Sequence, residues 1–316
     1  MGEMTAIRDA YGAALKELGE QDVRIVGLEA DVASSTKSGI FGSAFPERYF
    51  NVGISELNMV SMAAGLARTG FIPFVNTFAV FLTTRGADPI QSLIAYNKLN
   101  VKLCGAYCGL SDSYDGASHQ AITDLAFVRA IPNMTVITVA DAVETKKAVF
   151  AIAEHQGPVY LRLSRAAAPV FYPEDMKFEI GRGITVREGG DVTIITTGTV
   201  LHKALAAAEL LEAKGIRARV VDMHTIKPID EELIIECARE TGAIVTVEEH
   251  SVCGGLGSAV AEVLAEHMPV PMTRIGATDF AESGDYEQLL VKYGYGPESI
   301  AEKCEKVMKR KQVQKK

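Results

Sequence analysis

The chain has 316 residues, a length that two domains of ordinary size would fill. Its formal net charge of −8 argues against nucleic-acid binding, which needs a basic surface, and no apolar run reaches the ~20 residues of a membrane-spanning helix. Five scattered cysteines and an N-terminus without a long apolar core favour a reducing, cytoplasmic setting over secretion and a disulfide framework.

Strand and helix patterns alternate through the first half of the chain. An apolar helical face over residues 5–18 comes first. Buried strands are predicted at 23–28, 49–52, 71–77, 101–107, 134–139 and 159–163, and further helices at 56–68, 78–96, 121–130 and 142–154. This alternation predicts a mostly parallel sheet with helices on both of its faces.

The alternating pattern is lost over residues 171–190, where Pro173 and several glycines occur. It then restarts with predicted strands at 191–197, 218–223, 243–247 and 272–275, separated by helices at 201–214, 230–240 and 258–268. The sequence therefore predicts an α/β protein with two consecutive parallel-sheet domains, residues 1–178 and 179–316.

One acidic residue enters an otherwise apolar helix. Glu56 follows a turn at Gly53, and the residues after it are almost all apolar or small until Arg68. A carboxylate in that place either caps the helix or acts as a working acid in a buried site, and we favour the working acid. Phe78 and Phe81 lie three residues apart, where core packing is the default interpretation and an aromatic platform is the alternative.

The loop of residues 107–120 is unusually polar and rich in glycine. Helix capping accounts for one of its polar residues, but not for Asp115, His119 and Gln120 together. Polar groups concentrated in a loop at a strand end are usually functional, so a binding or catalytic role is favoured. Arg165 ends the last strand of the first domain, where it suits an anionic substrate group and a surface ion pair equally well.

Motifs for nucleotides and metals are weak or missing. The run Gly254-Gly255-Leu256-Gly257 has no acidic residue at the spacing of a dinucleotide site, so tight packing of a helix on a strand is the better interpretation. The six histidines show no metal-ligand spacing, and no metal site is predicted in this chain.

Several motifs together resemble the C-terminal half of transketolase, and they occur in the family's order. They are Gly53-Ile54-Ser55-Glu56, Thr77-Phe78-Ala79-Val80-Phe81, Asp115-Gly116-Ala117-Ser118-His119-Gln120, Leu163-Ser164-Arg165, Met223-His224-Thr225-Ile226-Lys227-Pro228 and Glu248-Glu249-His250. The family's N-terminal half holds thiamine diphosphate and a divalent metal with a Gly-Asp-Gly motif followed by Asn, and that motif does not occur here. The chain therefore looks like the small subunit of a split transketolase, inactive until an N-terminal subunit joins it.

The resemblance also implies an assembly and a role for each matching residue. The assembly would be α2β2, the partner would hold Mg²⁺ or Ca²⁺, and the reaction would move a two-carbon ketol unit from an anionic ketose to an aldose. Glu56 would bond and activate the aminopyrimidine of thiamine diphosphate, and His119 would contact the donor sugar near its reacting carbons. Further cofactor contacts are implied for Asp31, Phe78 and Phe81, and substrate contacts for Arg8, Ser35, Tyr107, Tyr114, Asp115 and Arg165.

The 107–120 loop departs from the family pattern in two places. Tyr107 stands where the family commonly has a histidine that helps to bind the substrate phosphate, and Ser113-Tyr114 replaces Gly-Glu. A sulfonated ketose of the sulfofructose type, or apulose 4-phosphate, is therefore an alternative donor. The chain also resembles the E1 β-type subunit of a 2-oxoacid dehydrogenase. This alternative is less favoured, because the polar loop with Asp115 and His119 suits a substrate with several hydroxyl groups. A non-catalytic regulatory or scaffold subunit could share the fold as well, but the intact Glu56 speaks against it.

Overall fold

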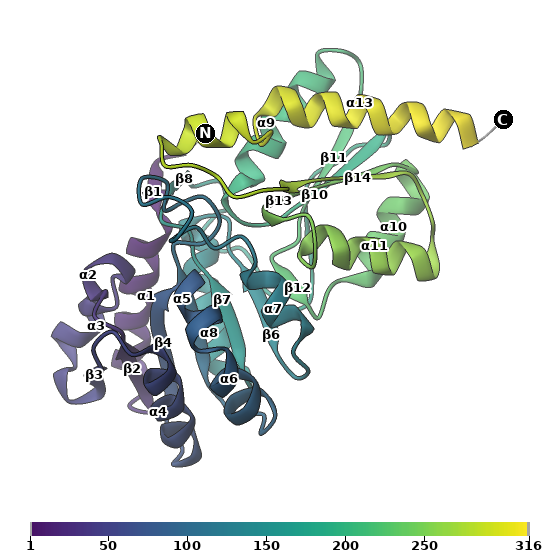
Figure 1. The fold of residues 1–316 in the computed structure, drawn as a ribbon. Coiled ribbons are helices and arrows are strands. Elements are labelled where there is room, and N and C mark those ends of the chain that lie inside the picture. The colour runs from purple at the N-terminus through teal and green to yellow at the C-terminus, as the bar shows by residue number, and fades with distance from the viewer. Residues whose placement is uncertain (1, 315–316) are drawn as a thin grey trace.

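In the computed structural model, which describes residues 2–314, the chain folds into two α/β units (Figure 1). The first unit is built on a seven-stranded sheet, in which all neighbouring strands are parallel except the pair β12–β6. In spatial order its strands are β12 (Thr225–Lys227), β6 (Thr135–Thr138), β7 (Val159–Arg162), β5 (Lys102–Ala106), β4 (Ile72–Phe78), β2 (Ile25–Glu29) and β3 (Tyr49–Asn51).

Helices cover both faces of the first sheet. On one face α1 (Ile7–Gln21) packs against α8 (Ala142–Glu154), and their apolar side chains share a core with the strands. On the other face lie α4 (Glu56–Arg68), α5 (Ala79–Arg85) and α7 (Asp124–Ala130). The shorter segments are α2 (Ala33–Thr36), α3 (Gly39–Ala44), the 3₁₀ turn η1 (Pro46–Arg48), α6 (Ala87–Pro89), the π-helical segment η2 (Ile90–Ala95) and an antiparallel pair, β1 (Met4–Ala6) with β8 (Ala167–Pro169).

The second unit has a five-stranded sheet, parallel except for β9. Its spatial order is β14 (Met272–Ala277), β13 (Ile244–Ser251), β10 (Val192–Thr196), β11 (Ala218–Asp222) and β9 (Ile184–Arg187). Its helices are the 3₁₀ turn η3 (Gly198–Val200), α9 (Leu201–Glu212), α10 (Glu231–Thr241), α11 (Leu256–His267), α12 (Tyr286–Lys292) and α13 (Pro297–Gln314). The long α13 packs along α9, at the top of Figure 1.

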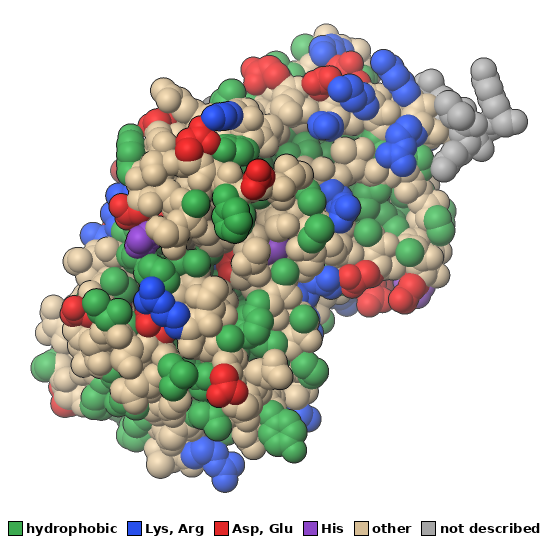
Figure 2. All heavy atoms as spheres, in the orientation of Figure 1, with side chains coloured by type: hydrophobic (Ala, Val, Ile, Leu, Met, Phe, Trp, Pro, Cys, Tyr) green, Lys and Arg blue, Asp and Glu red, His purple; other side chains and the backbone are tan. Residues whose placement is uncertain are grey.

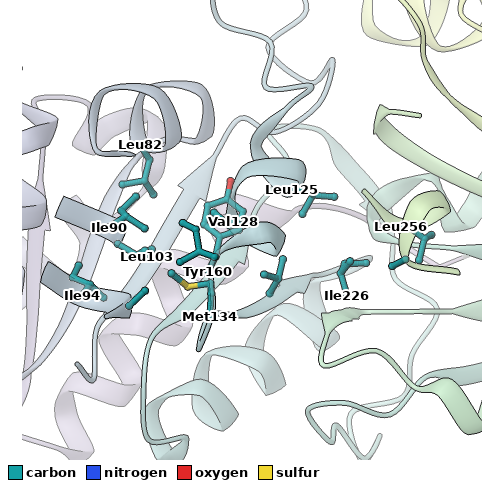
Figure 3. Close-up of a cluster of buried hydrophobic side chains, with 14 of the residues drawn as sticks. Leu82, Ile90, Ile94, Leu103, Leu125, Val128, Met134, Tyr160, Ile226 and Leu256 are labelled. Carbon is teal, nitrogen blue, oxygen red and sulfur yellow. The ribbon is translucent and has the colours of Figure 1, made fainter. Parts of the chain in front are cut away.

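The two units share a strand and a hydrophobic core. β12 comes from the second half of the chain, but it pairs antiparallel with β6 at the edge of the first sheet. Figure 3 shows the shared core, in which Leu125 and Met134 of the first unit belong to the same buried cluster as Ile226 and Leu256 of the second. Loops at the carboxyl ends of the first sheet can therefore rest on the second unit.

A buried ion pair lies at the boundary between the units. Arg162 donates to both carboxylate oxygens of Asp124, with Nε–Oδ2 and Nη2–Oδ1 distances of 2.7 and 3.1 Å. The same Nη2 donates to the carbonyl of Glu249 in the second unit at 3.0 Å, and the Tyr160 hydroxyl donates to Asp124 at 2.7 Å. Burial alone would raise the pKa of Asp124, but the guanidinium outweighs it and holds that pKa below its usual value.

Two carboxyl groups meet at the same boundary. Glu144 on α8 and Asp222 at the end of β11 are both fully buried. Ala140 N–H donates to Glu144 Oε2 at 2.6 Å, and the Tyr172 hydroxyl donates to Asp222 Oδ2 at 2.8 Å. The other two oxygens, Glu144 Oε1 and Asp222 Oδ1, have no hydrogen-bond partner, and Asp222 raises the pKa of Glu144 further, so a proton held between the two carboxyl groups would satisfy both oxygens. Burial is the main cause that raises the pKa of Asp222 to about 7.

The predicted α/β class with mostly parallel sheets is confirmed, and the six strands predicted in the first domain lie within two residues of their predicted positions. The single helix predicted over 78–96 was wrong. Three short segments occur there, because Gly86 follows α5 and Pro89 cannot donate a backbone hydrogen bond. The boundary after residue 178 stays a prediction. Within residues 2–314, none of the helices combines the length and apolarity needed to cross a bilayer.

Candidate cofactor and substrate site

Glu56 is the first residue of α4 and follows the Gly53 turn, where φ is 75°. Its side chain is only 5% exposed, and its Oε1 accepts a hydrogen bond from Arg85 Nη1 at 2.9 Å. Arg85, on α5, is 49% exposed, and its guanidinium lies 4.0 Å from the centre of the Phe81 ring. A buried carboxylate therefore lies beside an aromatic face and one solvent-accessible cation, which is more than helix capping requires.

Four rings gather at the carboxyl ends of β4 and β5. Phe78 ends β4 and Phe81 lies on α5, with their ring centres 5.7 Å apart. Tyr107, directly after β5, stacks on Phe78 at 4.4 Å, and His119 approaches Phe81 edge-on at 5.1 Å. Neighbouring parallel strands end at one edge of a sheet, which explains why these side chains meet. Phe78 and Phe81 stack within a small hydrophobic cluster, and their use as an aromatic platform stays a prediction.

Two arginines converge on Tyr107. Arg8 Nη1 donates to the Tyr107 hydroxyl at 2.5 Å and to the Ser35 carbonyl at 3.3 Å, while its buried Nε has no partner. Arg165 lies 5.3 Å from the centre of the same ring and donates to Asp112 Oδ1 at 3.3 Å. Two cations, one with an unsatisfied donor, form a cluster that is suited to an anion.

The acids of the 107–120 loop occupy different environments. Asp112 is buried, and burial followed by the nearby Asp115 raises its pKa to about 6, although Arg165 opposes the change. Asp115 itself is exposed. Tyr114 is 65% exposed, and no hydrogen bond or ring contact among the described residues joins it to the cluster. Tyr114 is therefore not brought together with the other predicted substrate residues.

Hydrogen bonds of Asn51 connect Asp31 to the Gly53 turn that precedes Glu56. Asp31, with φ of 64°, accepts from Asn51 Nδ2 at 3.1 Å, and Asn51 Oδ1 accepts from the backbone N–H of both Asp31 and Gly53, at 3.2 and 3.0 Å. Buried Glu29 holds the same loop, because its carboxylate accepts from the N–H groups of residues 30 and 32, both at 3.1 Å, and from the Thr36 hydroxyl at 2.8 Å. Hydrogen bonds to the buried Glu29 side chain thus hold the loop that carries Asp31 and Ser35.

The residues present fit an aromatic, nitrogen-containing ring. Such a ring needs a flat apolar face and an acid at its edge, and Phe78, Phe81 and Glu56 offer both. In the part of the chain that the structure describes, no group of three or more His, Cys, Asp or Glu side chains is arranged to hold a metal ion.

Comparison with known proteins assigns the family. Residues 3–170 match the pyrimidine-binding domain of transketolase, and residues 181–300 match the transketolase C-terminal domain. This chain belongs to the transketolase family. Both the predicted family and the predicted order of its two domain types are confirmed.

Relatives in the transketolase family include separate subunits. The "Putative transketolase C-terminal section" of Methanocaldococcus jannaschii is 45% identical and covers 98% of each chain. The "6-deoxy-6-sulfo-D-fructose transketolase subunit SqwH" of Clostridium sp. (strain MSTE9) is 42% identical over 96% of this chain and 95% of its own. Rat transketolase is 40% identical, but this chain spans only 49% of it.

A solved structure shows the same arrangement. It is titled "Split gene transketolase, inactive beta4 tetramer", is 50% identical, and superposes with a TM-score of 0.90 over 96% of this chain and 98% of its own. The chain is thus a transketolase-family C-terminal subunit of the split type.

Two site residues were missed from the sequence. Arg85 carries no signal of its own, because its partner lies 29 positions earlier on another helix. Asp112 was visible in the polar loop, but only its burial against Arg165 distinguishes it from the exposed acids around it.

Proposed function

We propose that this chain is the C-terminal subunit of a two-chain transketolase, which uses thiamine diphosphate to move a two-carbon ketol unit from an anionic ketose to an aldose. The observation that carries the proposal is a continuous series of contacts. It runs from Glu56 through Arg85 to Phe81 and Phe78, and from there to Tyr107 and its two arginines. An acid for the cofactor and a cation cluster for the substrate thus lie at opposite ends of one aromatic row.

Each end of the row has its own task. The chemistry supplied by bound thiamine diphosphate is carbanion stabilisation, which allows a carbon–carbon bond beside a carbonyl to break. Glu56 would hold a proton at the pyrimidine nitrogen, and Phe78 and Phe81 would pack on the ring. His119, on the edge of Phe81, would hydrogen-bond donor hydroxyls near the reacting carbons, and exposed Asp115 would take a hydroxyl farther along the sugar.

The anionic end of the ketose would be held by the arginine cluster. Arg8 and Arg165 supply the charge, and Ser35 and Tyr107 orient Arg8 by accepting its hydrogen bonds. A sulfonated ketose is a second candidate donor, favoured by the phenol of Tyr107 and by a relative named for 6-deoxy-6-sulfo-D-fructose. Phenol and guanidinium donors suit a singly charged sulfonate, whereas a doubly charged phosphate gains more from a further cation.

A partner subunit is part of the proposal. Phe50, Ile54, Leu57 and Met62 are exposed around the buried Glu56, and Phe50 and Met62 line an apolar groove of about 320 Å³. Hydrophobic side chains gather over this first unit in Figure 2. Contiguous exposed apolar surface of this kind marks an interaction site. We expect the N-terminal subunit to cover it, to bring the diphosphate and metal ligands, and to complete an α2β2 enzyme.

The test is reconstitution. The chain is purified alone and with a co-expressed N-terminal transketolase subunit, and ketol transfer is measured on phosphorylated and sulfonated ketoses. We expect activity only in the complex, and Glu56→Gln should lower kcat about 100-fold or more because a positioned proton is lost. Glu47→Gln, at an exposed glutamate of the same unit, is the control. Full activity of Glu56→Gln, activity of the chain alone, or release of CO₂ from pyruvate in place of ketol transfer would each refute the proposal.

A further inference from the structure

The 107–120 loop is built largely on the second unit. Gly284 N–H donates to the Ser113 carbonyl at 3.0 Å, and the Gln120 amide donates to the Glu282 carbonyl at 3.3 Å. A Cβ at Gly116 would collide with the Ser283 hydroxyl. Three positions of the loop, residues 113, 116 and 120, therefore contact the segment 282–284 of the second unit.

A shorter contact between the loop and the second unit is made by Glu249 on β13. Its Oε1 accepts the backbone N–H of Leu110 at 2.5 Å, and its Oε2 accepts the Tyr286 hydroxyl at 2.7 Å. The Glu249 side chain is buried, and its backbone carbonyl accepts from Arg162. Both oxygens of the Glu249 carboxylate are hydrogen-bonded to donors that the fold holds in place, so the carboxylate is confined to one position. It therefore also holds the Leu110 peptide in place.

The backbone before Leu110 is shaped to make this contact. Gly109 has a φ of 59°, and a Cβ there would lie 2.5 Å from Glu249 Oε1 and 2.6 Å from the Glu249 carbonyl. Tyr107 also has a positive φ, of 59°, which a tyrosine adopts only when its surroundings impose it. Leu110 lies between Tyr107 and Asp112, whose side chains accept hydrogen bonds from the Arg8 and Arg165 guanidinium groups.

We propose that Glu249 is a positioning residue for substrate binding, through which the second unit fixes the loop that holds Tyr107 and Asp112 against Arg8 and Arg165. The expected effect on sugar binding rests on the proposed function, whereas the expected effect on the conformation of the loop rests only on the contacts described above. The C-terminal domain thereby has a task in the site without touching the substrate.

The neighbouring residue provides a matched control. Glu248 is also buried on β13, and burial raises the pKa of both carboxyls to about 7. Glu248, however, accepts from the N–H groups of Leu256 and Gly257, at 2.6 and 2.7 Å, at the start of α11. Removal of Glu248 should therefore destabilise the second unit to a similar degree and leave the loop in place.

The experiment has two readouts on the full chain. The first is amide hydrogen exchange of peptides covering residues 108–121, which needs no activity. The second is the KM for the donor ketose in the reconstituted complex. Glu249→Ala should speed exchange and raise donor KM about ten-fold, with the half-saturating cofactor concentration unchanged. Glu249→Gln, whose amide can accept from Leu110 and donate to Tyr286, should restore both, and Glu248→Ala should change neither.

Each outcome decides the proposal. Unchanged exchange in Glu249→Ala, or an unchanged donor KM in its active complex, overturns it, as does an equal effect of Glu248→Ala on the loop. If Glu249→Ala does not fold, Tyr286→Phe removes one of the two bonds to the carboxylate, and exchange at the loop must still rise. A wild-type complex without ketol transfer refutes the proposed function, while exchange continues to test the positioning role.

Discussion

The proton shared by Glu144 and Asp222 should make the stability of this protein fall as pH rises. The ordinary pKa of an aspartate is 3.8, and that of Asp222 is raised to about 7, so the folded chain keeps a proton that the unfolded chain has released. The stabilising effect is complete below pH 4 and is lost as pH rises through 7. At about 1.4 kcal/mol per pKa unit, the loss is about 4 kcal/mol. Asp222→Asn removes the titration of residue 222, because its amide N–H can donate to Glu144 and its carbonyl oxygen can still accept from Tyr172.

The assay is urea unfolding followed by far-UV circular dichroism at pH 5, 6, 7 and 8. Because other buried carboxyl groups, such as Glu248 and Glu249, also have a pKa raised to about 7, the contribution of Asp222 is the difference between the wild-type and Asp222→Asn curves. Relative to wild type, Asp222→Asn should gain about 3 kcal/mol between pH 5 and 8. Asp175→Asn, at an exposed position, should keep the wild-type slope. A difference between the wild-type and Asp222→Asn free energies of unfolding that stays the same from pH 5 to pH 8 would refute the shared proton.

Three further predictions concern the interface and the loop. Asp124→Ala should lower the free energy of unfolding by about 3–5 kcal/mol in urea, since it leaves the Arg162 guanidinium buried without its partner; a loss below about 1 kcal/mol would contradict this. Gly109→Ala should cost roughly 1–3 kcal/mol in the same assay and raise donor KM, because the new methyl group meets Glu249 at a positive φ; an unaltered variant would show that the loop is free to move. Tyr107→Phe should raise the KM for an anionic ketose about five-fold with little change in kcat, since the hydroxyl that orients its arginine is lost; steady-state kinetics on the complex measure this, and an unchanged KM counts against that role.

Much of the fold followed from periodicity. Long strands such as 72–78 carry enough apolar residues for their place in a parallel sheet to be read from the chain. β12 could not be predicted, because three residues give no periodic signal and its partner, β6, lies about 90 positions earlier. The helical region after Phe78 was misjudged because Gly86 and Pro89, where its segments break, were taken as lying within one helix.

The contacts of the site could be predicted where the strand order of the sheet places two residues side by side. Phe78 and Tyr107 end neighbouring strands, so their contact follows from the strand order once the sheet is parallel. The ion pair of Glu56 with Arg85 depends on how two helices lie across the sheet, which residue types do not specify. The contact between Leu110 and Glu249 spans 139 positions and two domains, and nothing local to either residue indicates it.

The strand that the second half of the chain contributes to the first sheet limits where this protein can be divided. A cut between residues 178 and 225 would separate β12 from β6 and leave an unpaired sheet edge on the first fragment, which promotes aggregation. Domain exchange between relatives would have to move both units together or rebuild that edge.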